Sequence, residues 1–214
     1  MMQKLDYSIV RVDSESMLNE ALALLHKVYM SDVHSSVPAS HPQGLRIIYH
    51  SEYGPQLVDN YTNTSTWYVA IVDAKIVGCI CCYDQPDAKQ NHSLQHFVDN
   101  WLELDETFCG KLSNSIAVGR FAILPAFRNK RLALQLSLTA VWHCNEQRRS
   151  FLTVGLQSKN KAFLKRLGLI ELGSVKLSAN MPYADSAGLF IGFVESDPML
   201  AAILQKNNFS LSEI

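Results

Sequence analysis

The stretch from Gly119 to Leu136 reads GRFAILPAFRNKRLALQL and is the most informative segment of the chain. An apolar run that favours a β-strand ends at a proline, a short basic cluster follows, and an apolar helical pattern begins. The first turn of a helix exposes backbone N–H groups, and the helix dipole places positive charge there. Because Arg128, Lys130 and Arg131 add further positive charge, this segment predicts a phosphate-binding site.

The turn resembles the acyl-coenzyme A loop of the GNAT superfamily of N-acyltransferases, usually written V-x-P-x-Y/F-R-G-K-G-x-G/A. The corresponding segment, 123–133, reads ILPAFRNKRLA. The matching positions are Pro125, Phe127, Arg128, Lys130 and Ala133. Two positions that are commonly glycine in the family are Asn129 and Arg131 here. Glycine at such positions lets the backbone approach a diphosphate closely, so the substitutions bear on which donor is bound.

Basic residues in place of these glycines resemble one branch of the superfamily, the acyl-homoserine-lactone synthases and N-acyl amino acid synthases. Looser similarities to that branch lie in ALALLHKVYMSDV (21–33), VGRF (118–121) and AFLKRLGLIELG (162–173). The resemblance covers residues 5 to 195. It implies an α/β fold of the GNAT type, with a mixed, mostly antiparallel central sheet flanked by helices. Two parallel strands of that sheet splay apart at the acyl-donor site.

The resemblance also implies which residues hold the donor. The splayed strands correspond to Ile116 to Leu124 and Phe151 to Gln157. Phe121 and Ile123 offer main-chain groups to the acyl-pantetheine arm. The remaining donor-binding residues are those of the loop and the start of its helix: Arg128, Asn129, Lys130, Arg131, Leu132 and Ala133.

The catalytic groups are less well defined by the resemblance. The tyrosine acid of many GNAT enzymes corresponds to Leu164, and the glutamate of the lactone synthases corresponds to Ala117. Arg120 matches the strand arginine of that branch, and an arginine inside an apolar strand requires a partner or a function. Tyr183, in the polar segment 178–186, is a second catalytic candidate as an acid. The simpler interpretation of Tyr183 is a loop tyrosine without a catalytic role.

The function implied is transfer of an acyl group from a phosphopantetheine thioester, either acyl-coenzyme A or acyl carrier protein, to the amine of a small molecule. The alternative is a non-catalytic module of the same fold that binds an acyl thioester or a partner protein. A cysteine hydrolase ranks last, since no Cys and His form a recognisable motif. The basic residues Lys159, Lys161, Lys165 and Arg166 would attract an acidic carrier protein if they lie beside the loop.

Composition supports a single acyltransferase-like domain over residues 1–214. The chain is 48% hydrophobic and 18% charged, which suits one substantial core. Its formal net charge of −1 argues against a nucleic-acid partner bound through overall basicity. The oligomeric state is not predicted.

The cysteines and the N-terminal sequence favour the cytoplasm. Five cysteines, an odd number without zinc-ligand spacing, are expected to be reduced, buried thiols, so no metal is expected. The N-terminal sequence MMQKLDYSIVRV lacks the apolar core of a signal peptide. No run approaches the roughly 18 apolar residues of a membrane span, so none is expected.

Along the chain, strands and helices are expected to alternate. A strand at Tyr7–Val12 precedes a helix capped by Asp13 or Ser14. The segments 34–44 and 51–65 are expected to be loops, and His143 is expected at the surface or as a partner at a helix end. The other expected elements are a hairpin of 66–72 and 76–83, a short helix at 94–104, a strand at 151–156, a helix at 159–167 ended by Gly168, and strands at 171–177 and 188–194.

Overall fold

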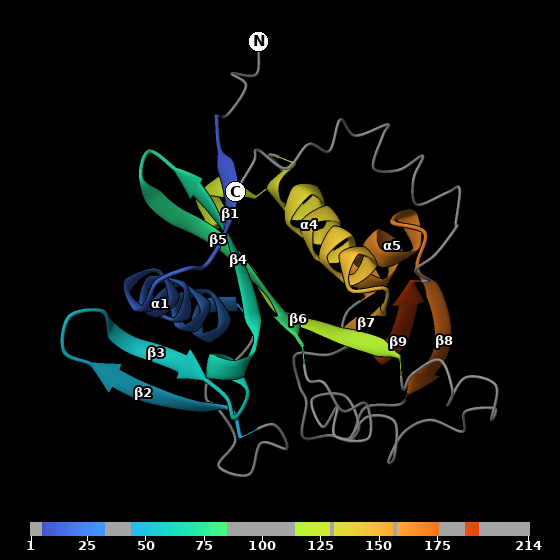
Figure 1. The fold of residues 1–214 in the computed structure, drawn as a ribbon, viewed down its shortest axis with the longest axis horizontal. Coiled ribbons are helices and arrows are strands. Elements are labelled where there is room, and N and C mark those ends of the chain that lie inside the picture. Colours follow the sequence, from blue (N-terminus) through green and yellow to red (C-terminus); the bar gives the residue numbers. More distant parts are fainter. Residues whose placement is uncertain are drawn as a thin grey trace. The chain divides into compact units, whose positions relative to one another are not determined.

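The computed structural model describes residues 6–32, 44–84, 114–128, 131–155, 158–175 and 187–192. These residues fall into two compact units (Figure 1), the first within 1–82 and 120–140 and the second within 83–119 and 141–209. Strand β6 (Ser115–Ile123) continues from the second unit into the first. The single domain expected from the sequence stays a prediction.

The first unit contains most of the antiparallel sheet. Its strands lie in the order β1-β4-β5-β6, and β4 pairs antiparallel with both β1 and β5. The strand and hairpin predicted in this part of the sequence are confirmed. The elements are β1 (Ser8–Arg11), α1 (Glu15–Asp32), β2 (Arg46–His50), β3 (Gly54–Val58), η1 (Thr62–Thr64), β4 (Thr66–Val72) and β5 (Lys75–Tyr83).

Local signals in the sequence determine the turn between β4 and β5 and the start of α1. The hairpin β4–β5 turns through Asp73 and Ala74, whose φ angles are +48° and +59°. Two consecutive positive φ angles are typical of the tight turn that matches the twist of paired strands. At the start of α1, the Ser14 hydroxyl accepts a hydrogen bond from the Met17 N–H at 3.3 Å. Of the two predicted caps, Asp13 and Ser14, it is therefore Ser14 that caps α1.

Helices cover both faces of the sheet in the first unit. On one face, the Cys79 thiol contacts the Ala21 carbonyl of α1 at 3.9 Å. On the other face lies the N-terminal part of α4 (Leu132–Glu146). A Cβ at Gly78 would lie 3.1 Å from Leu136 Cδ1 of α4 and 3.2 Å from the Ala122 carbonyl, so only glycine fits without displacing its neighbours.

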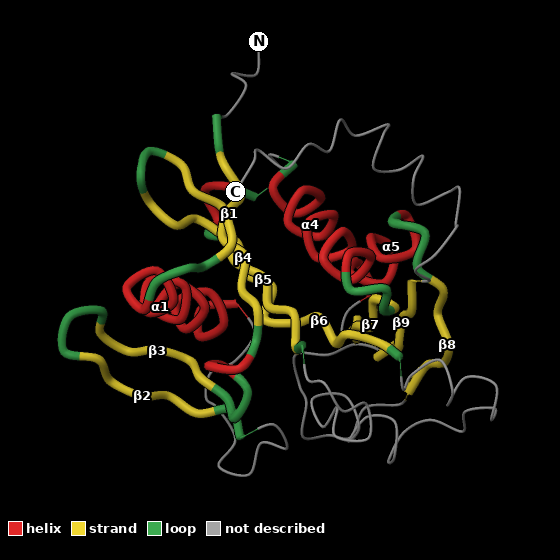
Figure 2. The backbone as a smooth tube through the Cα atoms, viewed as in Figure 1, coloured by secondary structure: helices red, strands yellow, loops and turns green. Residues whose placement is uncertain are grey.

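The loop expected at 51–65 is wrong, because β3 and η1 lie there. Strand β3 pairs antiparallel with β2 to form a two-stranded sheet, which Figure 2 shows beside α1. The sequence GPQLV resembles a loop because it starts with glycine and proline and contains Gln56. However, Gln56 is buried and donates hydrogen bonds to the Asn19 side chain and carbonyl at 3.1 and 3.2 Å. A buried, satisfied glutamine hides the strand pattern.

The second unit contains the remaining strands in the order β6-β7-β9-β8. Strands β6 and β7 are parallel, whereas β9 pairs antiparallel with β7 and β8. Gly168 follows α5 with a φ of +83°, as predicted for a helix-ending glycine. The elements are β7 (Ser150–Gly155), α5 (Ser158–Arg166), β8 (Ile170–Val175) and β9 (Ala187–Gly192). The mostly antiparallel α/β fold with one parallel pair is the fold predicted.

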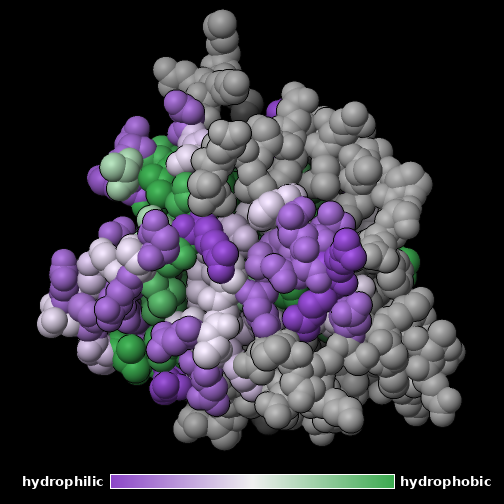
Figure 3. Space-filling model, in the orientation of Figure 1, coloured by the Kyte–Doolittle hydropathy of each residue, from purple (hydrophilic) through white to green (hydrophobic). Residues whose placement is uncertain are grey.

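Several predictions fall outside the described residues: the loop at 34–43, the helix at 94–104, Cys109, and the site candidates Asn129, Lys130 and Tyr183. Within the described residues, hydrophilic side chains cover most of the surface visible in Figure 3. Large exposed hydrophobic side chains there are Ile48, Tyr49, Phe121 and Ile170. None of the helices in the described ranges is long and apolar enough to cross a membrane.

Candidate active site

The predicted phosphate loop begins where β6 ends. The Leu124 N–H donates to the Val77 carbonyl at 2.9 Å, which holds the end of β6 against β5. A short 3₁₀ turn, η3 (Pro125–Phe127), follows and starts with the proline, whose fixed φ suits that position. The Arg128 side chain folds back so that its Nε donates to the Ile123 carbonyl at 3.1 Å.

Arg131 is the last residue of the loop before α4, and its φ is +63°. Its carbonyl accepts the Gln135 N–H at 3.0 Å, so the α-helical hydrogen bonding starts from Arg131. This backbone conformation suits glycine, the residue that the family commonly has here, and costs an L-residue about 1–2 kcal/mol. The chain therefore keeps the glycine-type turn while it carries a guanidinium at that position.

The donor-binding candidates differ in what they can offer to a ligand. The side chains of Arg128 and Arg131 are exposed, and Phe121 is 37% exposed. Leu132 is fully buried, so only its main chain can face a ligand, and Ile123 is buried with its carbonyl already engaged by Arg128. The structure thus leaves Arg131 exposed directly before α4, a position that favours anions, and Arg128 exposed at the end of η3.

Arg120, the catalytic candidate on β6, has a buried ionic partner. Its Nε and Nη2 lie 2.9 and 2.8 Å from Asp59 Oδ2, and the two side chains are only 9% and 2% exposed. The backbone of Arg120 has a φ of +51°, in the left-handed region that is unusual within a strand. The charged partner expected for an arginine in an apolar strand is therefore Asp59. A catalytic role for Arg120 stays a prediction.

Asp59 is held in place by its own turn. Its Oδ1 accepts hydrogen bonds from the Tyr61 N–H at 2.9 Å and the Thr62 hydroxyl at 3.2 Å. The Thr62 Oγ1 in turn accepts the Asp59 N–H at 2.9 Å. With both oxygens engaged, Asp59 fixes the Arg120 guanidinium. Asp59 was not predicted, because its segment DNYTNT (59–64) resembles an ordinary loop. The available signal was an aspartate followed by a threonine three residues later, a spacing that lets the two side chains and their backbone form a hydrogen-bonded turn.

The cysteines next to this ion pair are structural. Cys79 Sγ lies 3.6 Å from the Arg120 carbonyl, and burial raises the pKa of Cys79 to about 12. Burial also raises the pKa of Cys81, and the negative charge of Asp59 raises it further. Both thiols therefore stay protonated and act as small apolar side chains. The prediction of buried free thiols is confirmed for Cys79, Cys81, Cys82 and Cys144.

The parallel strands of the second unit pair over only part of their length. The register joins Ser115 to Ser150, Ile116 to Phe151 and Ala117 to Leu152. At the next position the Thr153 hydroxyl, rather than the backbone, donates to the Val118 carbonyl at 2.8 Å. This ending of the ladder is the splaying predicted for the donor-binding strands.

His143 lies in the second unit, in the last turn of α4. Of the two places expected for it, the surface is wrong, and a helix-end residue with a partner is what the structure shows. The side chain is buried, and Nε2 lies 2.6 Å from Asp84 Oδ1. Thr139, one turn earlier on α4, is also buried at 1% exposed, and its hydroxyl donates to the Gln135 carbonyl at 2.9 Å. Both side chains can be buried because their polar groups have partners inside the protein.

The basic residues of α5 are partly neutralised. Lys161 and Lys165 lie 2.6 and 2.7 Å from the carboxylate oxygens of Glu171. Although burial raises the pKa of Glu171, hydrogen bonds and charges from the two lysines lower it overall. The side chain of Lys159 lies outside the described residues, and Arg166 is exposed. The basic surface proposed to attract a carrier protein is therefore less positive than its sequence suggests.

Comparison with known families assigns the chain. A model described as the acetyltransferase (GNAT) family matches residues 32–169, well over half of the sequence. The chain belongs to the GNAT family. It is an acyltransferase by that membership, and the resemblance of its loop to the GNAT donor-binding loop agrees with this.

Several solved structures share the fold at low identity. A coenzyme A-dependent acyl-homoserine lactone synthase, BjaI, is 15% identical with a TM-score of 0.63 over 95% of this chain and 90% of BjaI. FeeM, an N-acyl amino acid synthase from uncultured soil microbes, is 13% identical with a TM-score of 0.57 over 89% and 92%. The polyamine N-acetyltransferase of Drosophila melanogaster is 13% identical with a TM-score of 0.58 over 88% and 100%. No curated protein sequence matches the chain.

Proposed function

We propose that this GNAT protein moves an acyl group from a phosphopantetheine thioester to the amine of a small molecule. The observation that supports the proposal is the segment between β6 and α4, in which two exposed arginines, Arg128 and Arg131, precede a helix N-terminus. Backbone N–H groups and guanidinium groups are the donors that bind phosphate oxygens. The phosphate groups of an acyl-coenzyme A or an acyl carrier protein would bind here.

Two observations bear on which donor is used. Membership of the GNAT family, and a structural neighbour that is a coenzyme A-dependent synthase, favour acyl-coenzyme A. Arg131 at a glycine-type position favours a donor whose phosphate does not need close backbone approach, such as the single phosphodiester of a carrier protein. The pairing of Lys161 and Lys165 with Glu171 reduces the positive charge available to such a partner. We propose acyl-coenzyme A first and acyl carrier protein second.

The chemistry requires few protein groups. The amine nitrogen attacks the thioester carbonyl carbon, a tetrahedral oxyanion forms, and the C–S bond breaks as the thiolate leaves. A thiol has a pKa of about 8.5, so the leaving group needs little protonation. The attacking nitrogen must lose a proton, and the oxyanion needs a hydrogen-bond donor. We assign no base, and Tyr183 is kept as the candidate acid.

Arg120 is proposed to position the strand at the reaction centre. Its left-handed backbone turns β6 out of regular geometry, and residues with such strain are concentrated at functional sites. The ion pair with Asp59 holds this conformation and neutralises the arginine. Arg120 thereby acts through the backbone, whereas Arg128 and Arg131 act through charge.

The acceptor is proposed to be a small-molecule amine, and the cytoplasm is the proposed location. The structural neighbours named above include an N-acyl amino acid synthase and a polyamine N-acetyltransferase, whose names specify acylated amines. Buried free thiols in the described part of the chain fit a reducing compartment.

A thiol-release assay tests the proposal. Acetyl-coenzyme A, a long-chain acyl-coenzyme A and acyl-loaded carrier protein are each incubated with a panel of amino acids, diamines and amino esters, and products are identified by mass spectrometry. Release of thiol with an acylated amine is expected for at least one combination. An Arg128→Ala/Arg131→Ala variant serves as the control for the donor site. Tight donor binding without transfer to any amine would instead support the non-catalytic module.

A further inference from the structure

The hairpin of β2 and β3 reverses direction through residues 51–53. His50 and Gly54 form the last pair of its ladder, and Gly54 has a φ of +73°, which is typical of a glycine that ends a hairpin loop. Figure 2 shows this hairpin beside α1. The turn shares no residue with the phosphate loop. The side chain that closes the turn is that of His50.

The His50 ring accepts hydrogen bonds from the turn. Its Nδ1 accepts the Glu52 N–H at 3.1 Å and the Tyr53 N–H at 3.4 Å. A ring nitrogen accepts only without a proton, so His50 is neutral in this arrangement and carries its proton on Nε2. The arrangement resembles an Asx turn, in which the side-chain oxygen of an asparagine or aspartate accepts a backbone N–H two residues later.

The closed turn connects the tip of the hairpin to α1. The Tyr53 ring lies against the His50 ring, with centroids 4.9 Å apart and planes tilted by 58°. The Tyr53 hydroxyl lies 2.8 Å from the Ser16 hydroxyl at the start of α1, within hydrogen-bonding distance. A second connection lies further along β3, where the buried Gln56 donates to Asn19. Of these two connections, only the one at the tip involves a side chain that contacts a histidine.

Histidine differs from the usual acceptors of such turns because it changes charge between pH 8 and pH 5. Protonation of Nδ1 would replace its lone pair with an N–H that faces the two N–H groups of the turn, so both hydrogen bonds would be lost. An asparagine oxygen would accept the same N–H groups at every pH in this range. Closure of the hairpin therefore does not require a titratable acceptor, and the histidine makes closure depend on a proton.

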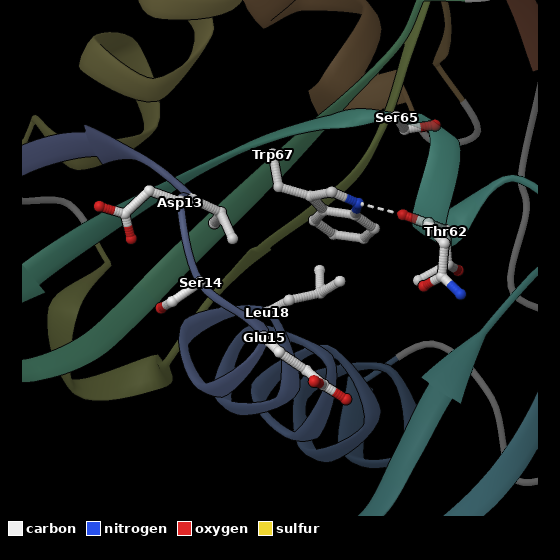
Figure 4. A pocket seen from close by; sticks show the side chains of 9 residues that line it. Asp13, Ser14, Glu15, Leu18, Thr62, Ser65 and Trp67 are labelled. Atoms are coloured by element: carbon white, nitrogen blue, oxygen red, sulfur yellow. Dashed lines mark hydrogen bonds between the residues drawn. The ribbon is translucent and has the colours of Figure 1, made fainter.

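The charged groups near the turn are mainly acidic. Glu52 lies in the turn, and Glu15 and Glu20 lie in the N-terminal half of α1; all three are exposed. Figure 4 shows the Glu15 carboxylate directed away from the Trp67 ring. Strand β3 has no charged residue, and Arg46 of β2 lies at the far end of the hairpin. The carboxylates attract a protonated ring and the turn N–H groups repel it, but a protonated Nδ1 no longer accepts in either case.

We propose that His50 is a pH-sensitive switch that closes the tip of the hairpin when neutral and opens it when protonated at Nδ1. Opening releases Tyr53 from Ser16, whereas the connection between Gln56 and Asn19 keeps β3 on α1. The change is therefore local to the tip of the hairpin. The switch requires nothing of the proposed acyl transfer.

Amide hydrogen exchange, followed by NMR at pH 7.5 and pH 5.5, tests the switch. Each rate is divided into the rate of an unstructured peptide at the same pH, which gives a protection factor. The protection factors of the Glu52 and Tyr53 amides are expected to fall by roughly fivefold at pH 5.5, as the loss of about one hydrogen bond each implies. Amides of β3 that are protected at pH 7.5 should keep their protection. The ring nitrogen chemical shifts of His50 should show the Nε2–H form at pH 7.5.

Three variants separate the titration of His50 from a general effect of acid. His50→Asn places an oxygen that does not titrate close to the position of Nδ1, so the protection should be the same at both pH values. His50→Ala removes the acceptor, so the protection should be low at both. His26→Asn is the matched control, because His26 lies about 15 Å along α1 from Ser16, and this variant should lose protection in acid as the wild-type protein does. Circular dichroism verifies that each variant is folded.

Three results would overturn the proposal. The first is equal protection of the two turn amides at both pH values in the wild-type protein. The second is a loss of protection in His50→Asn as large as in the wild-type protein, because the proton would then act elsewhere. The third is a proton on Nδ1 of His50 at pH 7.5. If His50→Asn does not fold, pH-dependent protection in His50→Ala would equally contradict the assignment of the switch to His50.

Discussion

Arg120 and Arg131 adopt the same unusual backbone conformation in two regions of the first unit. Their φ angles are +51° and +63°. Arg120 lies inside strand β6 with a buried side chain paired to Asp59, whereas Arg131 lies in the loop before α4 with an exposed side chain. The conformational cost is similar for both, but among the residues that the structure describes, only Arg120 has an ionic partner that offsets it.

The difference indicates two kinds of function. A strained residue that is held by a buried ion pair fixes the shape of the protein. A strained residue with an exposed charge has a side chain that can contact an anion. The charge of Arg131 also acts on Tyr7: burial raises the pKa of Tyr7, and the positive charge of Arg131 partly lowers it. The comparison therefore predicts that substitutions of Arg120 change stability and that substitutions of Arg131 change donor binding.

The largest expected effect is on stability at Arg120. Arg120→Met leaves the Asp59 carboxylate buried without its partner, which is expected to reduce the free energy of unfolding by about 3–5 kcal/mol. Urea denaturation followed by circular dichroism measures this change. Arg148→Met is the matched control, because Arg148 is exposed and also has a positive φ, of +51°. Its effect should stay within about 0.5 kcal/mol. A loss at Arg120 below about 1 kcal/mol would contradict the structural role.

The next largest effect is on donor binding. Replacing both Arg128 and Arg131 by alanine removes two charged donors, each worth about 1.5 kcal/mol or more when bonded to a phosphate. The Kd for the donor is therefore expected to rise about 100-fold, with little change in the free energy of unfolding. Calorimetric titration with coenzyme A measures it, and Arg148→Ala is the control. Unchanged affinity would mean that this loop does not hold the donor.

Glycine substitutions at Arg131 and Arg120 are expected to shift the melting temperature in opposite directions. Arg131→Gly removes the left-handed strain, which stabilises the folded state by about 1–2 kcal/mol. Because glycine loses more conformational entropy on folding, part of this gain is lost, and the net stabilisation is about 0.5–1 kcal/mol. The melting temperature should rise by about 1–4 °C. Arg120→Gly also removes strain but breaks the ion pair, so it should lower the melting temperature. Shifts of the same sign for both variants would show that the two arginines do not differ in role.

The partly buried ion pairs of Glu171 with Lys161 and Lys165 in the second unit provide the smallest expected effect. Since interactions with Lys161 and Lys165 lower the pKa of Glu171, its stabilisation is present above the ordinary pKa of 4.5 and is lost as the pH falls through the folded value. Glu171→Gln should cost at most about 1 kcal/mol at pH 7. Unfolding free energies at pH 7 and pH 3 measure the difference, which should disappear at pH 3. A difference that grows in acid would refute the assigned direction.

Much of the fold was predictable because its signals are local. The proline and basic turn after β6, the Ser14 cap, the turn at Asp73–Ala74 and Gly168 after α5 each mark a boundary within a few residues of sequence. The Asp59–Arg120 pair was not predictable, because its members are 61 positions apart and Asp59 lies in a loop-like segment. Burial of Gln56 and His143 was missed for the same reason, since each is satisfied by a partner distant in sequence.

The proposed function requires that the protein binds an acyl thioester, and the thermal stability of the protein with each donor measures this binding. The protein is melted with coenzyme A, acetyl-coenzyme A, a long-chain acyl-coenzyme A and acyl-loaded carrier protein, with the Arg128→Ala/Arg131→Ala variant alongside. A donor at 100 times its Kd stabilises the folded state by about 2.7 kcal/mol. A saturable rise in melting temperature with at least one donor, lost in the double variant, is the predicted result. No shift with any donor, or an equal shift in the double variant, would contradict the assignment of the loop.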